Sequence, residues 1–551
     1  MFSPQNYVGP WAGFLYGNNP PDNLTLSQTG QIIEYYDNGS KIISDGAGNL
    51  VPDAAKLSFV PTIVSTADGA NVFDQPYIKN LADDSSRRLS VFEQSVHSAE
   101  IETGRIIKCT VADGQFNGTT RRSTFRNSGV ASAVDRVLHV YIRYGQSLAG
   151  GGQRGSSGPS SYHLFTPYPY ADMGNHILMS NQGIKLSGTY AASQFTSFIP
   201  AYEVTDAGGD TGILPTCHLM MGAQAANYAT SVCACTFFLG GTAYSGIKKG
   251  TAPYTSYLAY ISKLTTMAAA LGFTSVVLDG IGWDHGEQDS GIVVGSTPAS
   301  ESTYSGYLQE IQGNFTSDWN AAAAVGGSIL TPVSGIHMFM ITKGLFYGGD
   351  LAGPFKAMQN AHLLGSGLGQ YFHCVGPQYN CHFVDNFHPW PFYYPLRLGL
   401  EGKAIRRFQY LGQNVSQIEA LQMSSWSFTG PNTAEATFIN NRGKLVLGDT
   451  AYLDDPGTMG ITYKDDSAST TVKAILPHSE PNKINIVFNG SATGANPKLR
   501  VAWNDTQSTQ QGLGVSEKAR CVIHDSDSDH VCVATGQVLY NYPIHTSLAP
   551  T

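Results

Sequence analysis

The sequence predicts an α/β fold with a parallel sheet covered by helices on both faces, a β-rich region before it and a small all-β domain after it. Three observations lead to this fold class. Between about residues 135 and 410, apolar runs alternate with amphipathic helical stripes, which is the pattern of βαβ units. Before this stretch the chain has only short strand-like runs, and after about residue 415 the helical stripes stop. The 61 glycines and 27 prolines among 551 residues favour turns and β-structure over helical bundles.

The elements of the central region follow one another in a regular order. Short apolar runs predict buried parallel strands at Val137–Ile142, Ser231–Leu239, Ser275–Leu278 and Ile336–Ile341. One helix is expected from Pro253 to Leu271, with Gly272 as its C-cap. A second helix is expected from the apolar stripe that runs from Tyr304 to Trp319.

We therefore expect the chain to divide into three parts. Residues 1–130 are interpreted as a β-rich accessory or attachment region, because turn signals separate strand-like runs such as Ile42–Ile43. Residues 131–412 form the α/β domain. Residues 413–551 form an all-β accessory domain, in which alternating segments such as Lys483–Phe488 are separated by Gly, Asn and Asp.

Composition excludes several classes of protein. A net charge of −9 with 13% charged residues argues against a nucleic-acid binder, which needs clustered cations. No run approaches the roughly 18 apolar residues of a membrane span. The first residues lack the basic and apolar segments of a secretory signal, so we expect a protein that stays in the cell or leaves it by another route. The eight cysteines have no disulfide-framework spacing and are expected to be free, although a pairing of Cys521 with Cys532 stays open.

Three polar motifs follow strands of the central region. In Gly145–Ser147, a serine in a glycine-containing turn between strand and helix can present its hydroxyl as a nucleophile; the alternative is a plain turn serine. The segment Trp283–Asp289 is by itself compatible with a solvated charged loop. In Asp385–His388, a carboxylate three positions before an imidazole can fix its tautomer; the alternative is a surface pair without a partner. Because ligand sites in parallel sheets gather at the carboxyl ends of strands, the ordered combination favours a catalytic interpretation.

This order of motifs resembles the SGNH hydrolase superfamily, and within it the sialate O-acetylesterase and acetylxylan-esterase group of carbohydrate esterases. The similar features are Gly-Gln-Ser after a strand, the Gly240–Gly241 strand end, the pattern Trp-x-x-Gly-Glu-x-Asp and the final Asp-x-x-His. The resemblance covers about residues 135–410. It implies a three-layer α/β/α sandwich of flavodoxin-like type.

The resemblance also implies a role for each matching position. Ser147 matches the nucleophile, and its own backbone N–H is one expected oxyanion donor. Gly241, or its neighbour Gly240, matches the glycine whose N–H is a second donor, since a residue without Cβ lets the backbone approach the substrate. His388 matches the general base, and Asp385 matches the residue that orients it.

The third block departs from the family pattern. The usual asparagine, a side-chain oxyanion donor, is replaced by the segment His285–Glu287. We expect His285 to donate from a ring nitrogen, with Glu287 orienting the site; the alternative is that Glu287 supplies or shares the acid role at His388. Gln146 and Gly240 are expected to support the site.

The implied function is a serine esterase that removes acetyl groups from a carbohydrate through an acetyl-serine intermediate, with no metal and no organic cofactor. The chain resembles bacteriophage tail-fibre or tailspike esterases in three features: its flanking β-rich parts, its missing secretory signal and its 11% aromatic residues. That setting implies an O-acetylated bacterial surface polysaccharide as substrate, a virion location and a homotrimer or attachment to a virion tail, with a cytoplasmic or otherwise released protein as the alternative. From another class, the alternative is a non-catalytic carbohydrate-binding or structural fibre protein on a hydrolase-like fold.

The acidic run Asp525–Asp529 is similar to the start of a calcium loop, but two key positions disagree. Position six is His530 instead of glycine, and position twelve is Gly536 instead of glutamate, which excludes an EF-hand. We therefore expect a solvated turn at this place.

Overall fold

The chain divides into two compact units, Met1–Val134 and Asp135–Thr551. The computed structural model describes, in the second unit, residues 136–151, 177–201, 211–221, 230–293, 296–347, 350–381, 383, 388–389, 393–503, 519–532 and 536–551. In the first unit it describes antiparallel strands of two small sheets: β1 (Glu34–Tyr35), β2 (Lys41–Ser44), β3 (Leu50–Pro52), and β4 (Ile63–Ser65), β5 (Asn71–Asp74), β7 (Arg105–Val111), β6 (Val96–Glu102).

The second unit is built on an eight-stranded sheet whose path runs β11-β9-β12-β8-β13-β14-β17, with β10 paired to β12 beside that path. β11 pairs antiparallel, and the other pairings are parallel. In path order the strands are β11 (Phe198–Pro200), β9 (Ile177–Ser180), β12 (Thr230–Phe238), β8 (Val137–Gly145), β13 (Ser275–Asp284), β14 (Met338–Thr342), β17 (Phe372–Pro377), and then β10 (Lys185–Ser187). The predicted α/β class is confirmed. The sheet, predicted to be parallel, is mostly parallel, because β11 pairs antiparallel with β9.

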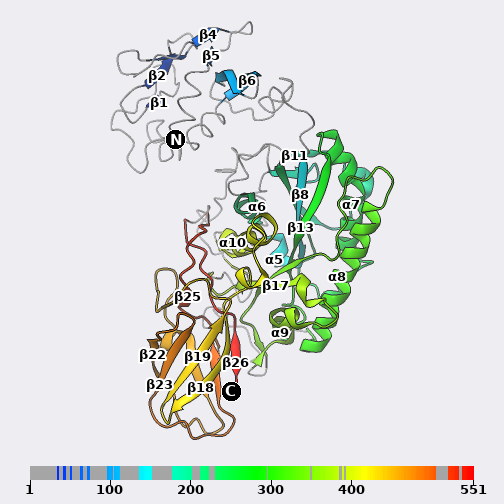
Figure 1. Cartoon of the computed structure of the whole chain (residues 1–551). Helices are drawn as coiled ribbons and strands as arrows, with labels where there is room; N and C mark the ends of the chain where they lie inside the picture. Colours follow the sequence, from blue (N-terminus) through cyan, green and yellow to red (C-terminus); the bar gives the residue numbers. More distant parts are fainter. Residues whose placement is uncertain are drawn as a thin grey trace, which may run out of the picture. The chain divides into compact units, whose positions relative to one another are not determined.

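Helices cover both faces of this sheet (Figure 1). Side chains of β8 alternate as a strand requires: Leu138, Val140, Ile142 and Tyr144 pack in one apolar cluster, and Tyr141 packs in another. The first cluster contains the apolar stripes of α7 and α8, and the second contains those of α6 and α10. The helices are α6 (Ile213–Met221), α7 (Ala252–Ala270), α8 (Glu301–Ala323), α9 (Gly353–Asn360) and α10 (Tyr394–Ile405).

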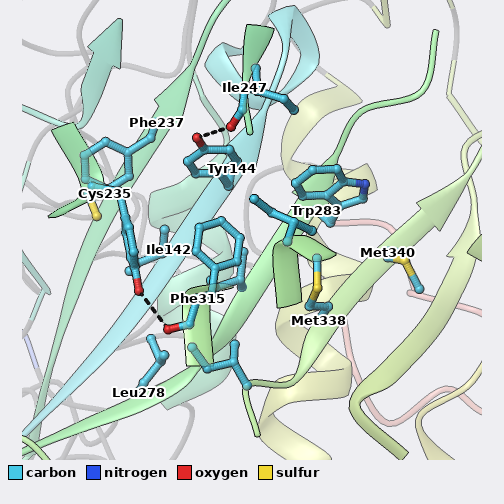
Figure 2. Packing of buried hydrophobic residues seen from close by; sticks show 14 of the residues in the cluster. Ile142, Tyr144, Cys235, Phe237, Ile247, Leu278, Trp283, Phe315, Met338 and Met340 are labelled. Carbon is cyan, nitrogen blue, oxygen red and sulfur yellow. Dashed lines mark hydrogen bonds between the residues drawn. The ribbon is translucent and has the colours of Figure 1, made fainter. Parts of the chain in front are cut away.

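An aromatic core fixes the ends of the two central strands. The ring of Tyr144 on β8 stacks on Trp283 of β13, with centroids 6.1 Å apart and planes 5° apart, and meets Phe315 edge-on at 5.0 Å. Its hydroxyl donates to the carbonyl of Ile247 at 2.6 Å (Figure 2). Because close-packed interiors leave little freedom, the residues that follow Tyr144 and Trp283 are held in place beside each other.

The last part of the second unit is antiparallel β-structure, drawn from yellow through orange to red in Figure 1. Its strands are β18 (Gln422–Gly430), β19 (Thr433–Ile439), β23 (Lys483–Phe488), β22 (Val472–Pro477); β21 (Ile461–Lys464), β24 (Lys498–Val501), β26 (Thr546–Leu548); and β20 (Leu445–Leu447), β25 (Ile523–Asp525). We call residues 419–551 the C-terminal β region. It shares apolar cores with the sheet and helices, because Trp503 and Ala519 pack in the cluster of α7 and α8, and Leu539 packs in that of α10.

The expectation of a solvated turn at Asp525–Asp529 is wrong, because the structure buries part of this segment. Asp527 accepts hydrogen bonds of 2.7 and 2.8 Å from the guanidinium of Arg407, and the Nζ of Lys403 lies 2.7 Å from the same carboxylate. Both cations belong to α10 and the helical turn that follows it, 120 positions away in the case of Arg407. A buried carboxylate needs such partners, and the local sequence gives no sign of them.

Two further findings concern cysteines and helices. The seven cysteines within the described ranges, Cys521 and Cys532 among them, are buried and form no disulfide. Among the described residues, no helix combines the length and the apolar character needed to cross a membrane.

Candidate active site

Ser147 and His388 lie side by side at the carboxyl edge of the sheet. Ser147 directly follows Gln146 at the end of β8 and begins the short helix α5 (Ser147–Gly150). His388 lies in the segment between β17 and α10. Its Nε2 is 2.8 Å from the Oγ of Ser147, and both residues are partly exposed. This distance allows a proton to pass directly from the hydroxyl to the imidazole.

Gly145 allows the turn that presents Ser147. A Cβ at this position would lie 1.9 Å from the carbonyl oxygen of Asp284, which is far inside van der Waals contact. The same carbonyl accepts a 2.9 Å hydrogen bond from the backbone N–H of Gln146. Only glycine lets β8 approach the end of β13 this closely, so the Gly-Gln-Ser sequence is explained by sterics as well as by chemistry.

Gly240 and Gly241 follow β12, which is the neighbour of β8 on the side away from β13. The N–H of Leu239 donates to the carbonyl of Gly145 at 3.2 Å, so the chain leaves β12 beside the turn that carries Ser147. Gly241 is exposed and has a φ of +62°, a conformation that favours glycine. The strand order therefore brings these glycines to the same sheet edge as Ser147.

His285 is placed differently from the expectation that it donates to an oxyanion. It is completely buried, its Nδ1 lies 2.8 Å from the hydroxyl of Tyr304, and its Nε2 lies 3.0 Å from the carbonyl of Thr242. A carbonyl can only accept, so Nε2 carries the hydrogen and Nδ1 accepts from the tyrosine. Burial lowers the pKa of His285 to about 3, which keeps the ring neutral. With both nitrogens occupied, His285 positions the backbone next to Gly241 and has no N–H to offer an oxyanion.

Gln146 is held by a buried carboxylate. Its Nε2 donates to Oε2 of Glu287 at 2.6 Å, and the other oxygen of Glu287 accepts from the Nζ of Lys343. All three side chains are almost completely buried. Glu287 therefore lies beneath the residue that precedes Ser147. This placement fits its expected supporting role, whereas the alternative acid role at His388 has no contact that supports it among the described residues.

Asp284, the last residue of β13, is surrounded by three cations. It accepts from Nη2 of Arg143 at 2.6 Å, from Nζ of Lys343 at 2.9 Å and from both Nη atoms of Arg397 at 2.6 Å. Burial alone would raise the pKa of Asp284, but the charges of Arg397, Lys343 and Arg143 hold it well below its usual range. The carboxylate is therefore ionised and joins β8, β13, the segment after β14 and α10 at one point.

Glu401 completes this charge network from α10. Its Oε1 lies 3.5 Å from Nη2 of Arg143, and its Oε2 accepts a hydrogen bond from the hydroxyl of Tyr141. Burial raises the pKa of Glu401, an effect that Arg143 and Arg397 oppose. Three cations thus face three carboxylates directly beneath the turn that carries Ser147, so a large buried charge is balanced locally.

Sequence reasoning missed the cations of this network. Arg143 interrupts the apolar run of β8, and Lys343 directly follows the apolar strand β14. A lone charge in or next to a buried strand requires a buried partner, and that signal was available from the sequence. The partners of Arg397 could not be found in this way, because Asp284 lies 113 positions away.

Asp385 lies outside the described residues, so its part in orienting His388 stays a proposal. Within the described part of the chain, no group of three or more His, Cys, Asp or Glu side chains could hold a metal ion.

No protein-family model matches the chain, and no curated protein matches it. Among solved structures, the chain is similar to a carbohydrate acetylesterase from Xanthomonas citri, with a TM-score of 0.42 and 11% identity, over 74% of this chain and 80% of that chain. It is also similar to a protein from Arabidopsis thaliana, with a TM-score of 0.31 and 14% identity, over 50% of this chain and 98% of that chain.

Proposed function

We propose that the protein is a serine ester hydrolase with Ser147 as nucleophile and His388 as general base. The observation that carries the proposal is the 2.8 Å contact between Ser147 Oγ and His388 Nε2 at the carboxyl edge of the sheet. A serine hydroxyl becomes a useful nucleophile when an adjacent base accepts its proton. The same contact disfavours a purely structural or binding role, for which a partly exposed hydroxyl beside an imidazole has no specific use.

The proposed reaction has two halves. As the Oγ proton of Ser147 passes to Nε2 of His388, Oγ forms a bond to the ester carbonyl carbon, and the carbonyl oxygen becomes negative. The backbone N–H groups of Ser147 and Gly241 are the proposed oxyanion donors. The C–O bond to the alcohol then breaks, and the departing oxygen takes the proton from His388. Water, deprotonated by His388, releases the acid and restores Ser147, while Asp385 is proposed to hold the imidazole in the required tautomer.

We further propose that the ester is an O-acetyl group of a carbohydrate, with bacterial surface polysaccharide as substrate. Support comes from four motifs whose order is similar to that in SGNH-type carbohydrate esterases. They are Gly145–Ser147, Gly240–Gly241, Trp283–Asp289 and Asp385–His388. The three-layer sandwich of those esterases is part of the same proposal. A place in a virion tail and a trimeric assembly belong to the same proposal and rest on the chain organisation alone.

The first experiment is hydrolysis of p-nitrophenyl acetate by wild type and Ser147→Ala. The variant should lose roughly a thousandfold or more in kcat, because the nucleophile is gone. Its melting temperature should be unchanged, since the hydroxyl is partly exposed. Ser275→Ala, which removes a hydroxyl from the opposite end of β13, is the matched control and should keep wild-type turnover. Near-normal turnover by Ser147→Ala, or no hydrolysis by wild type, would overturn the proposal.

The second experiment measures acetate released from O-acetylated bacterial polysaccharides, with chemically deacetylated samples as blanks. Sugars that bind away from the ester can hold it in position, so kcat/KM for the preferred polymer should exceed that for p-nitrophenyl acetate after correction for the leaving group. An active enzyme that releases no acetate from any polymer of the panel would leave the ester hydrolase proposal standing and would remove the carbohydrate substrate.

A further inference from the structure

The segment that follows β14 supports the nucleophile turn. Its first residue, Lys343, reaches Asp284 with Nζ at 2.9 Å from Oδ1 and also donates to Glu287. Glu287 in turn holds the side chain of Gln146, the neighbour of Ser147. We call residues 343–347 the support loop. Its position is coupled by three buried contacts to the turn that presents the nucleophile.

The opposite side of the support loop packs against the C-terminal β region. A Cβ on Gly344 would lie 2.7 Å from Cε1 of His545 and 3.3 Å from Cβ of Ala519. The ring of Phe346 meets Trp503 with centroids 4.7 Å apart and planes at 64°. All of these side chains are buried, so the support loop has no room to relax on that side.

His545 is itself held firmly in place. Its Nδ1–H donates to the carbonyl of Ala502 at 2.6 Å, and its ring also packs edge-on against Tyr379 at 5.5 Å between centroids. The hydroxyl of Tyr379 donates to the carbonyl of Pro543 at 2.6 Å. Tyr379 belongs to the segment that leads from β17 toward His388. The strip 542–545 therefore touches both the support loop and the segment that carries the proposed base.

We propose that the C-terminal β region is part of the active-site scaffold: through His545, Ala519 and Trp503 it holds the support loop where Lys343 reaches Asp284 and Glu287. This inference rests on the proposed esterase activity. It makes Lys343 and His545 positioning residues, because neither touches Ser147 or His388 through any hydrogen bond in the described structure. It also means that the C-terminal β region serves turnover of a small ester and is more than a device for binding polymers.

The decisive variant is Gly344→Ala in the full chain. Gly344 has an ordinary backbone conformation for any residue, so the added methyl acts through its contact with His545. Displacement of a positioning element by about 1 Å can lower turnover up to a hundredfold, and we expect kcat on p-nitrophenyl acetate to fall about tenfold with KM within about twofold of wild type. The matched control is Gly313→Ala on α8, where an added Cβ meets open space.

Two double variants separate positioning from simple loss of stability. His545→Ala makes room for the added methyl, so Gly344→Ala/His545→Ala should recover part of the lost kcat. In a Lys343→Met background the contact with Glu287 is already gone, so Gly344→Ala should cause little further loss of kcat. If the added methyl only destabilised the fold, Gly344→Ala would lower kcat by the same factor in the wild-type and Lys343→Met backgrounds.

Each assay is run about 15 °C below the lowest melting temperature of the set, an interval well beyond the shift of about 2–4 °C that 1 kcal/mol produces in large domains. Hydrogen exchange at residues 343–347 gives a readout that does not need activity, and it should be faster in Gly344→Ala than in Gly313→Ala.

Wild-type kcat in a folded Gly344→Ala, or an undiminished loss of kcat in the Lys343→Met background, would overturn the inference while leaving Ser147 as the nucleophile. Absence of hydrolysis by wild type would instead overturn the proposed function. Should Gly344→Ala fail to fold, Trp503→Phe, which leaves a smaller ring against Phe346, is tested in the wild-type and Lys343→Met backgrounds.

Discussion

The guanidinium of Arg397 donates two hydrogen bonds of 2.6 Å to the carboxylate of Asp284, one to each oxygen. This bidentate contact joins α10 to the end of β13, on the residue whose carbonyl also receives the N–H of Gln146. The network around Asp284 therefore fixes the geometry of the nucleophile turn and the stability of the fold together.

Replacing Asp284 by Asn should destabilise the protein strongly. The change leaves Arg143, Lys343 and Arg397 buried with one carboxylate fewer, and removing one partner of a buried ion pair costs about 3–5 kcal/mol. Urea unfolding followed by tryptophan fluorescence measures the loss. Glu480→Gln removes an exposed partner of Lys483 and should leave the midpoint nearly unchanged. Equal midpoints for Asp284→Asn and wild type would contradict the role given to the network.

Gly145→Ala should lower turnover even where the protein stays folded. The new methyl cannot remain 1.9 Å from the carbonyl of Asp284, so the end of β8 has to move and Ser147 moves with it. We expect kcat on p-nitrophenyl acetate to fall by about a hundredfold. Gly306→Ala on α8, where nothing lies within 4 Å of an added Cβ, controls for the glycine-to-alanine change itself. Unchanged kcat in Gly145→Ala would show that the turn tolerates a side chain.

His285→Ala should lower kcat and leave the acid side of the pH profile in place. The pKa of His285 is lowered to about 3 by burial, so this ring is neutral throughout the range from about pH 5 to 9 and has no proton to lose there. Loss of the contact to the Thr242 carbonyl loosens the backbone beside Gly241, for which we expect about a tenfold fall in kcat. A shift of the acid midpoint by about one pH unit would show that His285 titrates during catalysis.

Glu419→Gln should stabilise the protein above neutral pH and have little effect near pH 4. Burial raises the pKa of Glu419 from 4.5 to about 7, and among the described residues nothing forms a hydrogen bond with its buried Oε1. The folded state therefore holds this proton more tightly than the unfolded state, so stability falls as pH rises from about 4.5 to 7 and stays low above that range.

A neutral glutamine avoids this loss, and the free energy of unfolding at pH 8 should rise by about 1–3 kcal/mol. Thermal unfolding across pH 4 to 9 measures the difference. Glu435→Gln is the matched control, because the pKa of Glu435 is lowered by its hydrogen bond to Lys483, and it should give no stabilisation at pH 8. Equal gains at pH 4 and pH 8 for Glu419→Gln would rule out titration as the cause.

Structural features that depend on the local spacing of apolar residues could be predicted from the sequence. The stripe of Tyr304, Leu308, Ile311, Phe315 and Trp319 is buried along α8 as expected, because helical spacing alone decides which side chains share a face. The meeting of motifs at one sheet edge could also be anticipated, since parallel strands end on the same side. The 2.8 Å contact between Ser147 and His388 is the structural counterpart of that reasoning, and its catalytic use stays a proposal.

Features that depend on distant partners could not be predicted. An imidazole N–H such as that of His285 could serve as an oxyanion donor, but both ring nitrogens are already hydrogen-bonded, to Tyr304 and to the Thr242 carbonyl. The residues next to His285 in the sequence do not indicate these partners. The sequence around Asp527 is that of a polar turn, but Lys403 of α10 and Arg407 of the turn after α10 pair with its buried carboxylate. In both cases the partners that decide the role of the side chain come from other segments of the chain, so the local sequence is not enough to predict that role.

The packing of Trp503 and His545 against the support loop has a consequence for synthesis of the chain. A polypeptide leaves the ribosome from its N-terminal end, at about 5–20 residues per second, so Phe346 emerges well before the residues that cover it. During that interval its apolar ring lacks its contacts with Trp503 and His545. We expect newly made chains to need chaperone protection until His545 has left the ribosome. Chains truncated between Trp503 and His545 should give little folded protein, although they contain both Ser147 and His388.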